Sequence, residues 1–191
     1  MIKVLLINNY DSFVYNIKQI LDESGLCQTD IILNDKISLS EASKYDKIII
    51  SPGPGLPKES GNIIKIIKEL SPTKNILGIC LGFQAIAEVF GGELYQLDKI
   101  YHGHQSEVEI TDKNESIFKS ISSPFLAGRY HSWALKTDSF PKELIVTSRT
   151  YDGIIMSFRH AKFDVCGVLF HPESIMTPAG KIIIKNWLNI K

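Results

Sequence analysis

The first half of the chain alternates short apolar runs with amphipathic stretches. Four apolar runs have the length and composition of strands, at residues 3–7, 27–33, 47–50 and 76–79. Between them, apolar residues repeat at helical spacing after Asp11 or Ser12, over 63–70 and directly after Cys80. Gly25 and the pair Gly91-Gly92 offer helix stops. This alternation is typical of βαβ units, which build a parallel sheet with helices packed against it.

Beyond Glu93 the pattern changes to short strand-like pieces separated by turn residues. They span residues 106–110, 125–128, 144–148, 154–158 and 165–170, and they predict an antiparallel or mixed C-terminal extension of the sheet. Thr177-Pro178 is a good capping pair for a last helix over 179–188. We therefore expect one α/β domain over residues 1–191, with an open, mostly parallel central sheet and helices on both of its faces.

Composition and charge narrow the class of protein. The 191 residues are enough for a conventional hydrophobic core. The 21 basic and 21 acidic residues balance, so no large field draws the chain to nucleic acid or an anionic membrane, and a partner must be recognised by shape. The N-terminus lacks the features of a signal peptide and no apolar run is long enough to span a bilayer, so we expect a cytoplasmic protein.

Cys80 is the strongest candidate nucleophile. In Gly78-Ile79-Cys80-Leu81-Gly82 an apolar strand runs directly into a helix, with a glycine two positions to each side of the cysteine. This is the nucleophile-elbow pattern with cysteine in place of serine, and the following helix N-terminus stabilises a thiolate. A merely buried cysteine is the alternative, and we favour it for Cys27 and Cys166, which lie in apolar strands. The three cysteines are odd in number and far apart, which predicts reduced thiols.

His171-Pro172-Glu173 supplies the base and the acceptor that a thiol nucleophile needs. The motif ends the apolar run 165–170, and residues two apart in extended backbone project to the same side. Pro172 favours that extended geometry. Glu173 is then expected to accept one imidazole N–H and to direct the other ring nitrogen toward Cys80. A surface turn with an incidental ion pair would be the better interpretation of this motif by itself, but the elbow reverses that preference.

Ser51-Pro52-Gly53-Pro54-Gly55 follows another strand of the predicted sheet. Its backbone is expected at the carboxyl edge, where open α/β sheets bind ligands. The N–H of Gly53 is a candidate partner for the N–H of Leu81 in an oxyanion hole. By itself, a Pro-Gly-Pro-Gly run is more often a rigid turn. Its position gives this one its functional weight.

The residues alone do not decide the role of two further clusters, 102–104 and 129–133. His102-Gly103-His104 has the spacing of two metal ligands on a strand, but no third ligand is identifiable nearby. We therefore predict no metal site and expect a loop near the active site. The segment 129–133, Arg-Tyr-His-Ser-Trp, suits the binding of a small zwitterion, and it equally suits a strand with a satisfied core histidine.

Together, the elbow with Gln84, the Pro-Gly-Pro-Gly loop and His171-Pro172-Glu173 resemble the class I glutamine amidotransferases over essentially the whole chain. Segments 9–13, 129–132 and 170–175 look like those of the chorismate-using branch. That branch comprises the glutaminase subunits of anthranilate synthase and aminodeoxychorismate synthase. The resemblance implies a flavodoxin-like fold. This sequence differs from the branch at three positions: Asn8, where many relatives have Asp, His104, where Lys is common, and Trp133, where Leu is frequent.

The resemblance implies a mechanism and a set of partners. Cys80 would attack the carboxamide of L-glutamine to form a glutamyl thioester, with His171 and Glu173 completing a catalytic triad. The residues implied around the glutamine are Gly53, Pro54, Gly55, Leu81, Gln84, Ser132 and Trp133. Ammonia would pass to a chorismate-binding synthase subunit, which would hold Mg²⁺, while this subunit needs no cofactor.

Several alternatives are weighed against this assignment. A free-standing hydrolase of the gamma-glutamyl hydrolase type would turn over without any partner. A catalytically silent regulatory subunit is disfavoured by the intact Cys, His and Glu set. The small subunit of carbamoyl phosphate synthetase carries an additional N-terminal domain for which this chain has no room. A separate GMP synthetase glutaminase fits the length, and only segments 10–13 and 129–132 argue against it. We favour anthranilate synthase over aminodeoxychorismate synthase on resemblance only.

Overall fold

A nine-stranded sheet forms the centre of the computed structural model, which describes residues 1–190. Its parallel half contains β1 (Ile2–Asn8), β2 (Cys27–Leu33), β3 (Lys47–Ile50), β4 (Asn75–Ile79) and β11 (Val165–Val168). Its antiparallel half contains β6 (His104–Ile110), β7 (Phe125–Arg129), β9 (Leu144–Thr150) and β10 (Ile155–His160). The strand order is β2-β1-β3-β4-β11-β10-β9-β6-β7. The chain thus joins five parallel strands to an antiparallel extension, as predicted.

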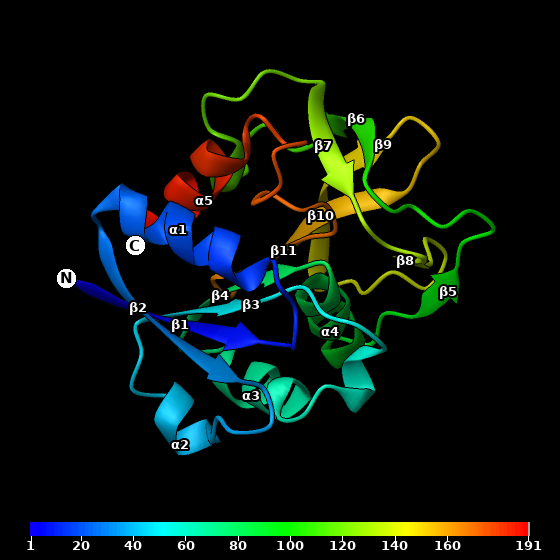
Figure 1. The fold of residues 1–191 in the computed structure, drawn as a ribbon. Coiled ribbons are helices and arrows are strands. Elements are labelled where there is room, and N and C mark those ends of the chain that lie inside the picture. The colour runs from blue at the N-terminus through cyan, green and yellow to red at the C-terminus, as the bar shows by residue number, and fades with distance from the viewer. Residues whose placement is uncertain (191) are drawn as a thin grey trace.

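Helices cover both faces of the parallel half (Figure 1). On one face lie α1 (Val14–Ser24) and α5 (Gly180–Leu188), and on the other lie α2 (Leu39–Ala42), α3 (Ile63–Leu70) and α4 (Leu81–Val89). Two short 3₁₀ turns, η1 (Pro57–Glu59) and η2 (Ser116–Phe118), complete the helical elements. A separate ribbon pairs β5 (Leu94–Gln96) with β8 (Trp133–Leu135). The predicted α/β class and its layers are therefore confirmed.

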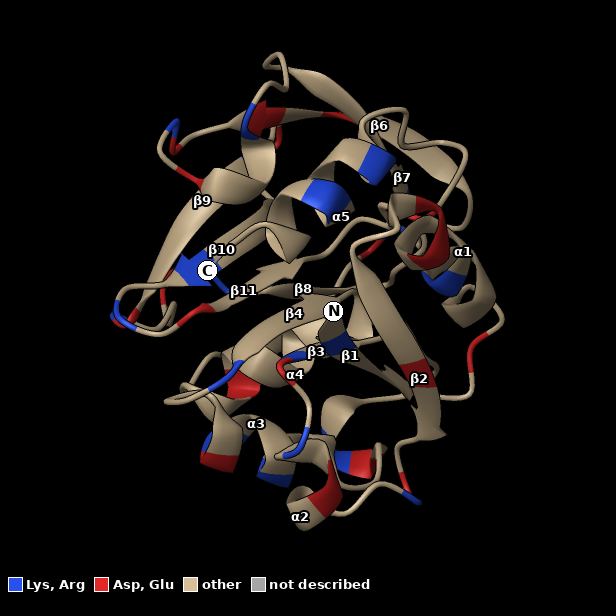
Figure 2. Ribbon diagram, turned by 90° about the vertical axis from the view of Figure 1, so that its left-hand side faces the viewer, with Lys and Arg blue, Asp and Glu red and all other residues tan. Residues whose placement is uncertain are grey.

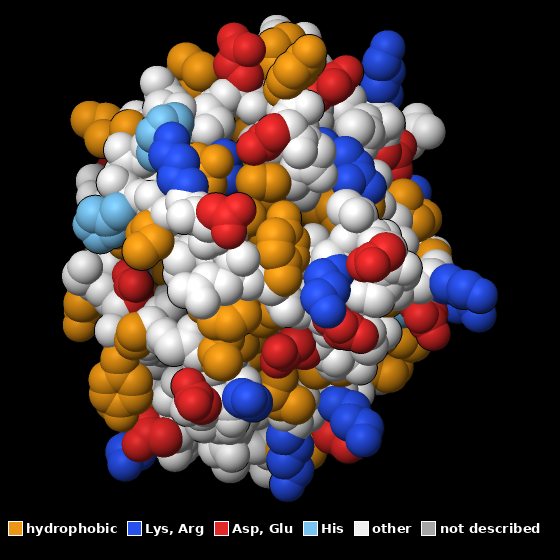
Figure 3. Space-filling model, turned by 90° about the vertical axis from the view of Figure 1, so that its right-hand side faces the viewer, with side chains coloured by type: hydrophobic (Ala, Val, Ile, Leu, Met, Phe, Trp, Pro, Cys, Tyr) orange, Lys and Arg blue, Asp and Glu red, His pale blue; other side chains and the backbone are white. Residues whose placement is uncertain are grey.

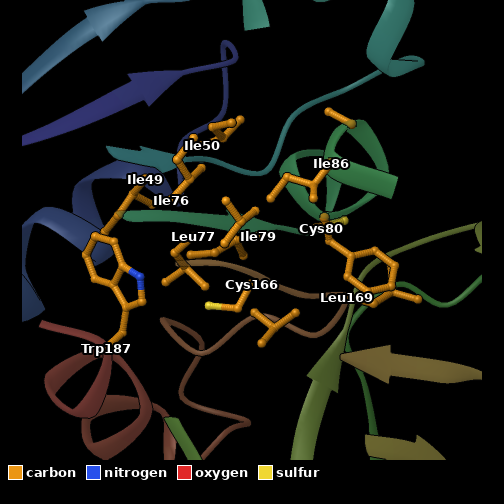
Figure 4. Packing of buried hydrophobic residues seen from close by; sticks show 14 of the residues in the cluster. Ile49, Ile50, Ile76, Leu77, Ile79, Cys80, Ile86, Cys166, Leu169 and Trp187 are labelled. Atoms are coloured by element: carbon orange, nitrogen blue, oxygen red, sulfur yellow. The ribbon is translucent and has the colours of Figure 1, made fainter. Parts of the chain in front are cut away.

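The hydrophobic core lies on both sides of the central strands. Every residue of β3, β4 and β11 is buried, which explains why these strands are continuous apolar runs with little alternation. Leu77 and Cys166, which pair in adjacent strands, and Trp187 of α5 all belong to this core (Figure 4). Charged residues lie mainly on the helices and loops around it (Figure 2). This covering leaves the ends of the strands as the places where polar groups can gather.

Local signals in the sequence set several boundaries. The predicted strands at 27–33 and 47–50 coincide with β2 and β3. Gly25 ends α1 with a left-handed φ of 65°, as expected of a helix-terminating glycine. The predicted strand 165–170 is shorter in the structure, because β11 ends at Val168.

The predicted helix cap at Thr177 is wrong. The residue before α5 is Ala179, which makes no side-chain cap hydrogen bond. The Thr177 hydroxyl is engaged elsewhere, because it donates to the carbonyl of His171 and accepts the N–H of Gly128. The Thr177 hydroxyl thus makes long-range hydrogen bonds instead of the helix cap that the local sequence predicts.

Cysteines and surface agree with an ordinary globular chain. None of the three cysteines forms a disulfide, and Cys27 and Cys166 are buried in strands as predicted. Burial raises the pKa of Cys166 well above its ordinary value. Acidic, basic and apolar side chains are intermingled on the face seen in Figure 3. Within residues 1–190, no helix has the length and apolar character needed to cross a membrane.

Candidate active site

A cavity of about 460 Å³ opens at the carboxyl edge of the parallel strands. Four parts of its lining follow strands of the parallel half: 10–13 after β1, 52–54 after β3, Cys80 after β4 and His171 after β11. His102, just before β6, and Tyr130, just after β7, complete the lining. The chain passes from β1 to β2 on one side of β1 and then crosses to β3 on its other side, so the winding direction reverses there. Open α/β sheets bind ligands at such a switch point. The topology therefore gathers the predicted nucleophile and base in one cavity.

Cys80 lies at a sharp bend between β4 and α4 (Figure 4). Its φ of 51° and ψ of −97° are rare for a residue with a side chain. Its backbone N–H donates to the carbonyl of Val168 at 2.8 Å, so β11 fixes the bend. Such strain persists where surrounding structure enforces it, often at functional sites. The geometry is that of the predicted elbow, and the Cys80 side chain is 7% exposed at the cavity.

The two flanking glycines are required by close backbone contacts. A Cβ atom at Gly78 would lie 2.4 Å from the carbonyl oxygen of Gly82. A Cβ atom at Gly82 would lie 2.4 Å from the carbonyl oxygen of Ile50. Real Cβ contacts are not this short, so neither position accepts a side chain without moving the backbone. The expectation that the elbow needs glycine is confirmed.

His171 and Glu173 form a buried pair behind the cavity. The Nδ1 of His171 donates to Oε1 of Glu173 at 2.7 Å, because a carboxylate can only accept. Burial alone would lower the pKa of His171, but the charge of Glu173, aided by the neighbouring Cys80 thiol, raises it to about 10. The imidazole is therefore protonated at neutral pH.

The other ring nitrogen of His171 is directed to Cys80. Nε2 is buried and no atom of residues 1–190 forms a hydrogen bond with it, although the Cys80 thiol is close enough to affect the pKa of the ring. The rings of Phe13 and Tyr130 pack against the imidazole, with centroids at 5.2 and 4.7 Å. The thiol and the imidazole are thus neighbours at the cavity, without a formed hydrogen bond between them.

The Ser51–Gly55 loop is held beside the elbow. Asn9 donates its side-chain amide to the carbonyl of Ser51 at 2.8 Å and its backbone N–H to the Ser51 hydroxyl at 3.0 Å. Gly53 approaches so closely that a Cβ there would lie 2.5 Å from Cβ of Asn9 and 2.8 Å from Cδ2 of Leu81. Leu81 is the first residue of α4, whose leading N–H groups have no partner within the helix. The two predicted oxyanion donors thus belong to adjacent segments.

The other predicted glutamine contacts lie outside the cavity lining. Gly53 and Pro54 line the cavity, whereas Gly55, Leu81, Gln84, Ser132 and Trp133 are not among its lining residues. Gln84 is 4% exposed, and its Nε2 lies 3.5 Å from the carbonyl of Trp133. Ser132 and Trp133 are half-buried where β8 begins. The structure brings Gln84 and Trp133 together, and the role of these five residues in binding glutamine stays a prediction.

The Arg129–Trp133 segment divides between core and cavity. Arg129 is buried, with its guanidinium 3.4 Å from the ring centroid of Tyr101 and its Nε donating to Nε2 of His131. The Nδ1–H of His131 therefore donates to the carbonyl of Trp133 at 3.0 Å. Burial, reinforced by the charge of Arg129, lowers the pKa of His131 to about 3. His131 is the satisfied core histidine, and Tyr130 is the member that reaches the cavity.

Of the two histidines in His102-Gly103-His104, only His102 lies in the predicted loop, because His104 is the first residue of β6. His102 lines the cavity, whereas the His104 ring packs edge-on against Tyr101. In the described part of the chain, no group of three His, Cys, Asp or Glu side chains is placed to hold a metal ion.

Sequence reasoning gave no site role to residues 10–13, and it pointed to Tyr130 only as one member of the 129–133 cluster suited to a small zwitterion, although both belong to family-like segments. The signal that could have identified residues 10–13 is their position in the chain. Residues 10–13 directly follow β1 at the ligand-binding edge, and Tyr10 has a left-handed φ of 61°. Phe13 and Tyr130 also pack against each other, with ring centroids 5.1 Å apart.

Comparison with known protein families gives a match over almost the whole chain. The model of the class I glutamine amidotransferase family matches residues 5–190. Anthranilate synthase component 2 of Methanocaldococcus jannaschii is 46% identical, and the match covers 94% of this chain and 89% of that protein. The aminodeoxychorismate/anthranilate synthase component 2 of Bacillus subtilis is 41% identical over 97% and 95% of the two chains. The chloroplastic anthranilate synthase beta subunit 1 of Arabidopsis thaliana is 42% identical over 98% of this chain and 70% of that protein.

Solved structures share the fold. A GMP synthase-type protein of Thermoplasma acidophilum superposes with a TM-score of 0.88 at 26% identity, covering 98% of this chain and 92% of that one. A glutamine amidotransferase of Thermotoga maritima gives a TM-score of 0.75 at 18% identity, over 90% and 76% of the two chains. The second likeness concerns the fold alone.

Proposed function

The chain belongs to the class I glutamine amidotransferases, and we propose that it is the glutaminase subunit of anthranilate synthase. The observation that carries the proposal is the pairing of a strained Cys80 elbow with a Glu173-held imidazole at one cavity. The reaction is the hydrolysis of L-glutamine to glutamate and ammonia. The ammonia then aminates chorismate on a partner subunit.

Cys80 acts as the nucleophile of this reaction. An imidazolium beside a thiol at a helix N-terminus favours the thiolate, which is the attacking form. The sulfur forms a bond to the carboxamide carbon of glutamine, and the carbonyl π electrons move onto oxygen. When the C–N bond breaks, His171 donates its Nε2 proton to the departing nitrogen, and ammonia leaves. Water then attacks the glutamyl thioester and gives a proton to Nε2 of His171. The carbon–sulfur bond breaks, glutamate leaves, and the thiolate and the imidazolium are restored.

Backbone amides stabilise the negative oxygen in this scheme. The N–H of Leu81 begins α4, and the N–H of Gly53 lies in the adjacent loop that Asn9 holds. Fixed donors of this kind act where charge develops and cost little reorganisation. Gly53 and Pro54 line the cavity, and Gly55, Leu81, Gln84, Ser132 and Trp133 are assigned to its surroundings as glutamine contacts. Glu173 holds the imidazole tautomer whose Nε2 faces the sulfur.

The partner is a chorismate-binding synthase subunit, component I. The relatives named component 2 or beta subunit support a divided enzyme in which this chain supplies ammonia. Ammonia made in the cavity reaches the synthase site through a channel, and the synthase holds the Mg²⁺ and chorismate. This subunit needs no cofactor for the chemistry above, because every group in the scheme is a side chain or backbone amide of the chain.

A second product is favoured by one relative. The Bacillus subtilis protein carries both aminodeoxychorismate and anthranilate in its name, and this chain matches 95% of its length. One glutaminase that serves two synthases would use the same Cys80 chemistry with different partners. We place this second, aminodeoxychorismate-directed function after the first, because the other relatives described above are named for anthranilate synthase alone.

The test is to co-express the chain with each candidate synthase subunit, purify the complex and identify the aminated product. With glutamine, chorismate and Mg²⁺, the anthranilate synthase complex is expected to produce anthranilate. Production of aminodeoxychorismate with the other synthase would add the second function. If the chain binds neither synthase and hydrolyses glutamine at full rate by itself, it is a free-standing hydrolase and the proposal is wrong.

A further inference from the structure

The backbone of His171 is not held by the strand that precedes it. Sheet pairing of β11 ends at Val168, three residues before His171. The N–H of His171 instead donates to the carbonyl of Gly128, in β7, at 3.0 Å. β7 is the edge strand of the antiparallel half, four positions beyond β11 in the strand order. The position of His171 therefore depends on a contact between distant parts of the fold.

Thr177 completes this contact with its side chain. Its Oγ1 donates to the carbonyl of His171 at 2.6 Å and accepts the N–H of Gly128 at 2.9 Å. With the bond from His171 N–H to Gly128 O, the three residues form a closed ring of hydrogen bonds. Both backbone groups of His171 and both of Gly128 are thereby used. Thr177 is 4% exposed, so water does not readily replace it.

The surrounding packing requires the loop to lie close to β7. A Cβ at Gly128 would lie 2.9 Å from Cβ of Met176 and 3.2 Å from Oγ of Ser174. The Ser174 hydroxyl also contacts the hydroxyl of Tyr130, at 3.0 Å, and the Tyr130 ring packs on the imidazole of His171. The loop from 171 to 177 thus packs against the end of β7, and the hydrogen bonds of the Thr177 hydroxyl hold it there.

We propose that Thr177 is a positioning residue for the glutaminase reaction, whose hydroxyl fixes the His171 backbone so that its imidazole meets the sulfur of Cys80. The inference rests on the proposed function, because it assigns the effect to His171 as the proton-transfer group. Only a hydroxyl can donate to one backbone group and accept from another here. Valine has nearly the same shape but makes neither bond, and serine retains both.

The kinetic consequence is specific. A displacement of the imidazole by about 1 Å lowers the rate of chemistry by about 100-fold, while glutamine contacts elsewhere persist. The imidazolium also stabilises negative charge on the sulfur less well, because this effect falls with the distance between ring and sulfur. Loss of the Thr177 hydroxyl is therefore expected to lower kcat far more than it changes KM.

The experiment compares Thr177→Val and Thr177→Ser in the full chain, assembled with its synthase subunit. Thr147→Val is the matched control, because Thr147 is fully buried in β9 and its hydroxyl bonds Ser157 at 2.6 Å, away from the cavity lining. Three quantities are measured: kcat and KM for glutamine hydrolysis, and the rate of Cys80 alkylation by iodoacetamide at neutral pH, followed by mass spectrometry. Folding is checked by thermal unfolding.

Thr177→Val is expected to lower kcat by about 100-fold and to slow the alkylation of Cys80 at neutral pH. Thr177→Ser is expected to keep kcat and the alkylation rate near their wild-type values. Thr147→Val is expected to lower the stability of the fold but not kcat. If Thr177→Val does not fold, Thr177→Ala, which removes the same hydroxyl, carries the same expectation.

Three results would overturn the inference. They are a folded Thr177→Val with wild-type kcat and alkylation rate, a Thr177→Ser with kcat as low as that of Thr177→Val, or a Thr147→Val with kcat equally low. These results differ from failure of the proposed function, in which the wild-type complex itself would not hydrolyse glutamine.

Discussion

Gly82 lies against Ile50 so closely that a Cβ atom on the glycine would come within 2.4 Å of the isoleucine carbonyl oxygen. This contact joins the first turn of α4 to the end of β3, and it lets the Cys80 bend sit beside the Ser51–Gly55 loop. The space is closed by backbone, which cannot swing aside as a flexible side chain can. The elbow thus depends on the absence of a single methyl group.

Gly82→Ala is expected to destabilise the fold by about 3 kcal/mol and to abolish glutaminase activity, because β3 and α4 must separate. Gly25→Ala is the control: Gly25 has a similarly special φ of 65° but no atom within 4 Å of its missing Cβ. That variant is expected to lose about 1 kcal/mol and to keep its activity. Chemical denaturation and glutamine hydrolysis measure both. Equal stability losses in the two variants would contradict the packing argument.

Glu173→Gln is expected to shift the alkaline limit of glutaminase activity to lower pH. In the wild type, Glu173 outweighs the effect of burial and raises the pKa of His171 to about 10, so the ring proton is lost only near that pH. Without the carboxylate charge, burial dominates and the proton leaves earlier.

The pH dependence of kcat tests this shift. Glu115→Gln serves as the control, because Glu115 is also a buried carboxylate but does not line the cavity. An alkaline limit that stays in place in Glu173→Gln would show that the carboxylate does not set the His171 pKa.

Removing His171 is expected to cost more than removing Glu173. His171→Ala eliminates the proton-transfer group and is expected to lower kcat by about 10⁴-fold or more, whereas Glu173→Ala leaves the imidazole and loses about 10 to 100 times less. Both are measured at saturating glutamine, with folding verified by circular dichroism. Equal losses in the two folded variants would count against the division of roles between the proton-transfer group and the orienting group.

Two buried histidines, His131 and His171, are expected to differ in charge at pH 7. Burial and Arg129 lower the pKa of His131 to about 3, which leaves it neutral with its proton on Nδ1. His171, with a pKa of about 10, is protonated. Ring ¹⁵N chemical shifts of the labelled protein distinguish the two forms, and His131→Gln and His171→Gln assign the signals. A His131 ring that titrates between pH 5 and 8 would refute this assignment.

Much of the parallel half was predictable because its signals are local. Apolar runs bounded by turn residues gave β2 and β3 their limits, and Gly25 marked the end of α1. The glycines around Cys80 predicted the elbow, because close backbone contact excludes all other residues there. His171 and Glu173 were predicted as a pair from their spacing alone, and they are joined by a hydrogen bond.

The remainder depends on contacts between residues far apart in the chain. The Thr177 hydroxyl had a local use as a helix cap, but Gly128 and His171 compete for it successfully. The Arg129 segment left two interpretations open, and only the pairing of strands shows that Tyr130 reaches the cavity while His131 is buried. The ribbon of β5 and β8 was not predicted, because each strand is three residues long.

The most direct measurement compares the wild-type and Cys80→Ser complexes with two nitrogen sources, and assembly with the chorismate-aminating synthase serves to check folding. With glutamine, Cys80→Ser is expected to form no detectable aminated product, because the hydroxyl is a far weaker nucleophile than the thiolate. With added ammonium ions, both complexes are expected to form product at the same rate, because amination occurs on the other subunit. Retention of glutamine-dependent amination by the variant, or loss of both activities in a properly assembled complex, would contradict the account.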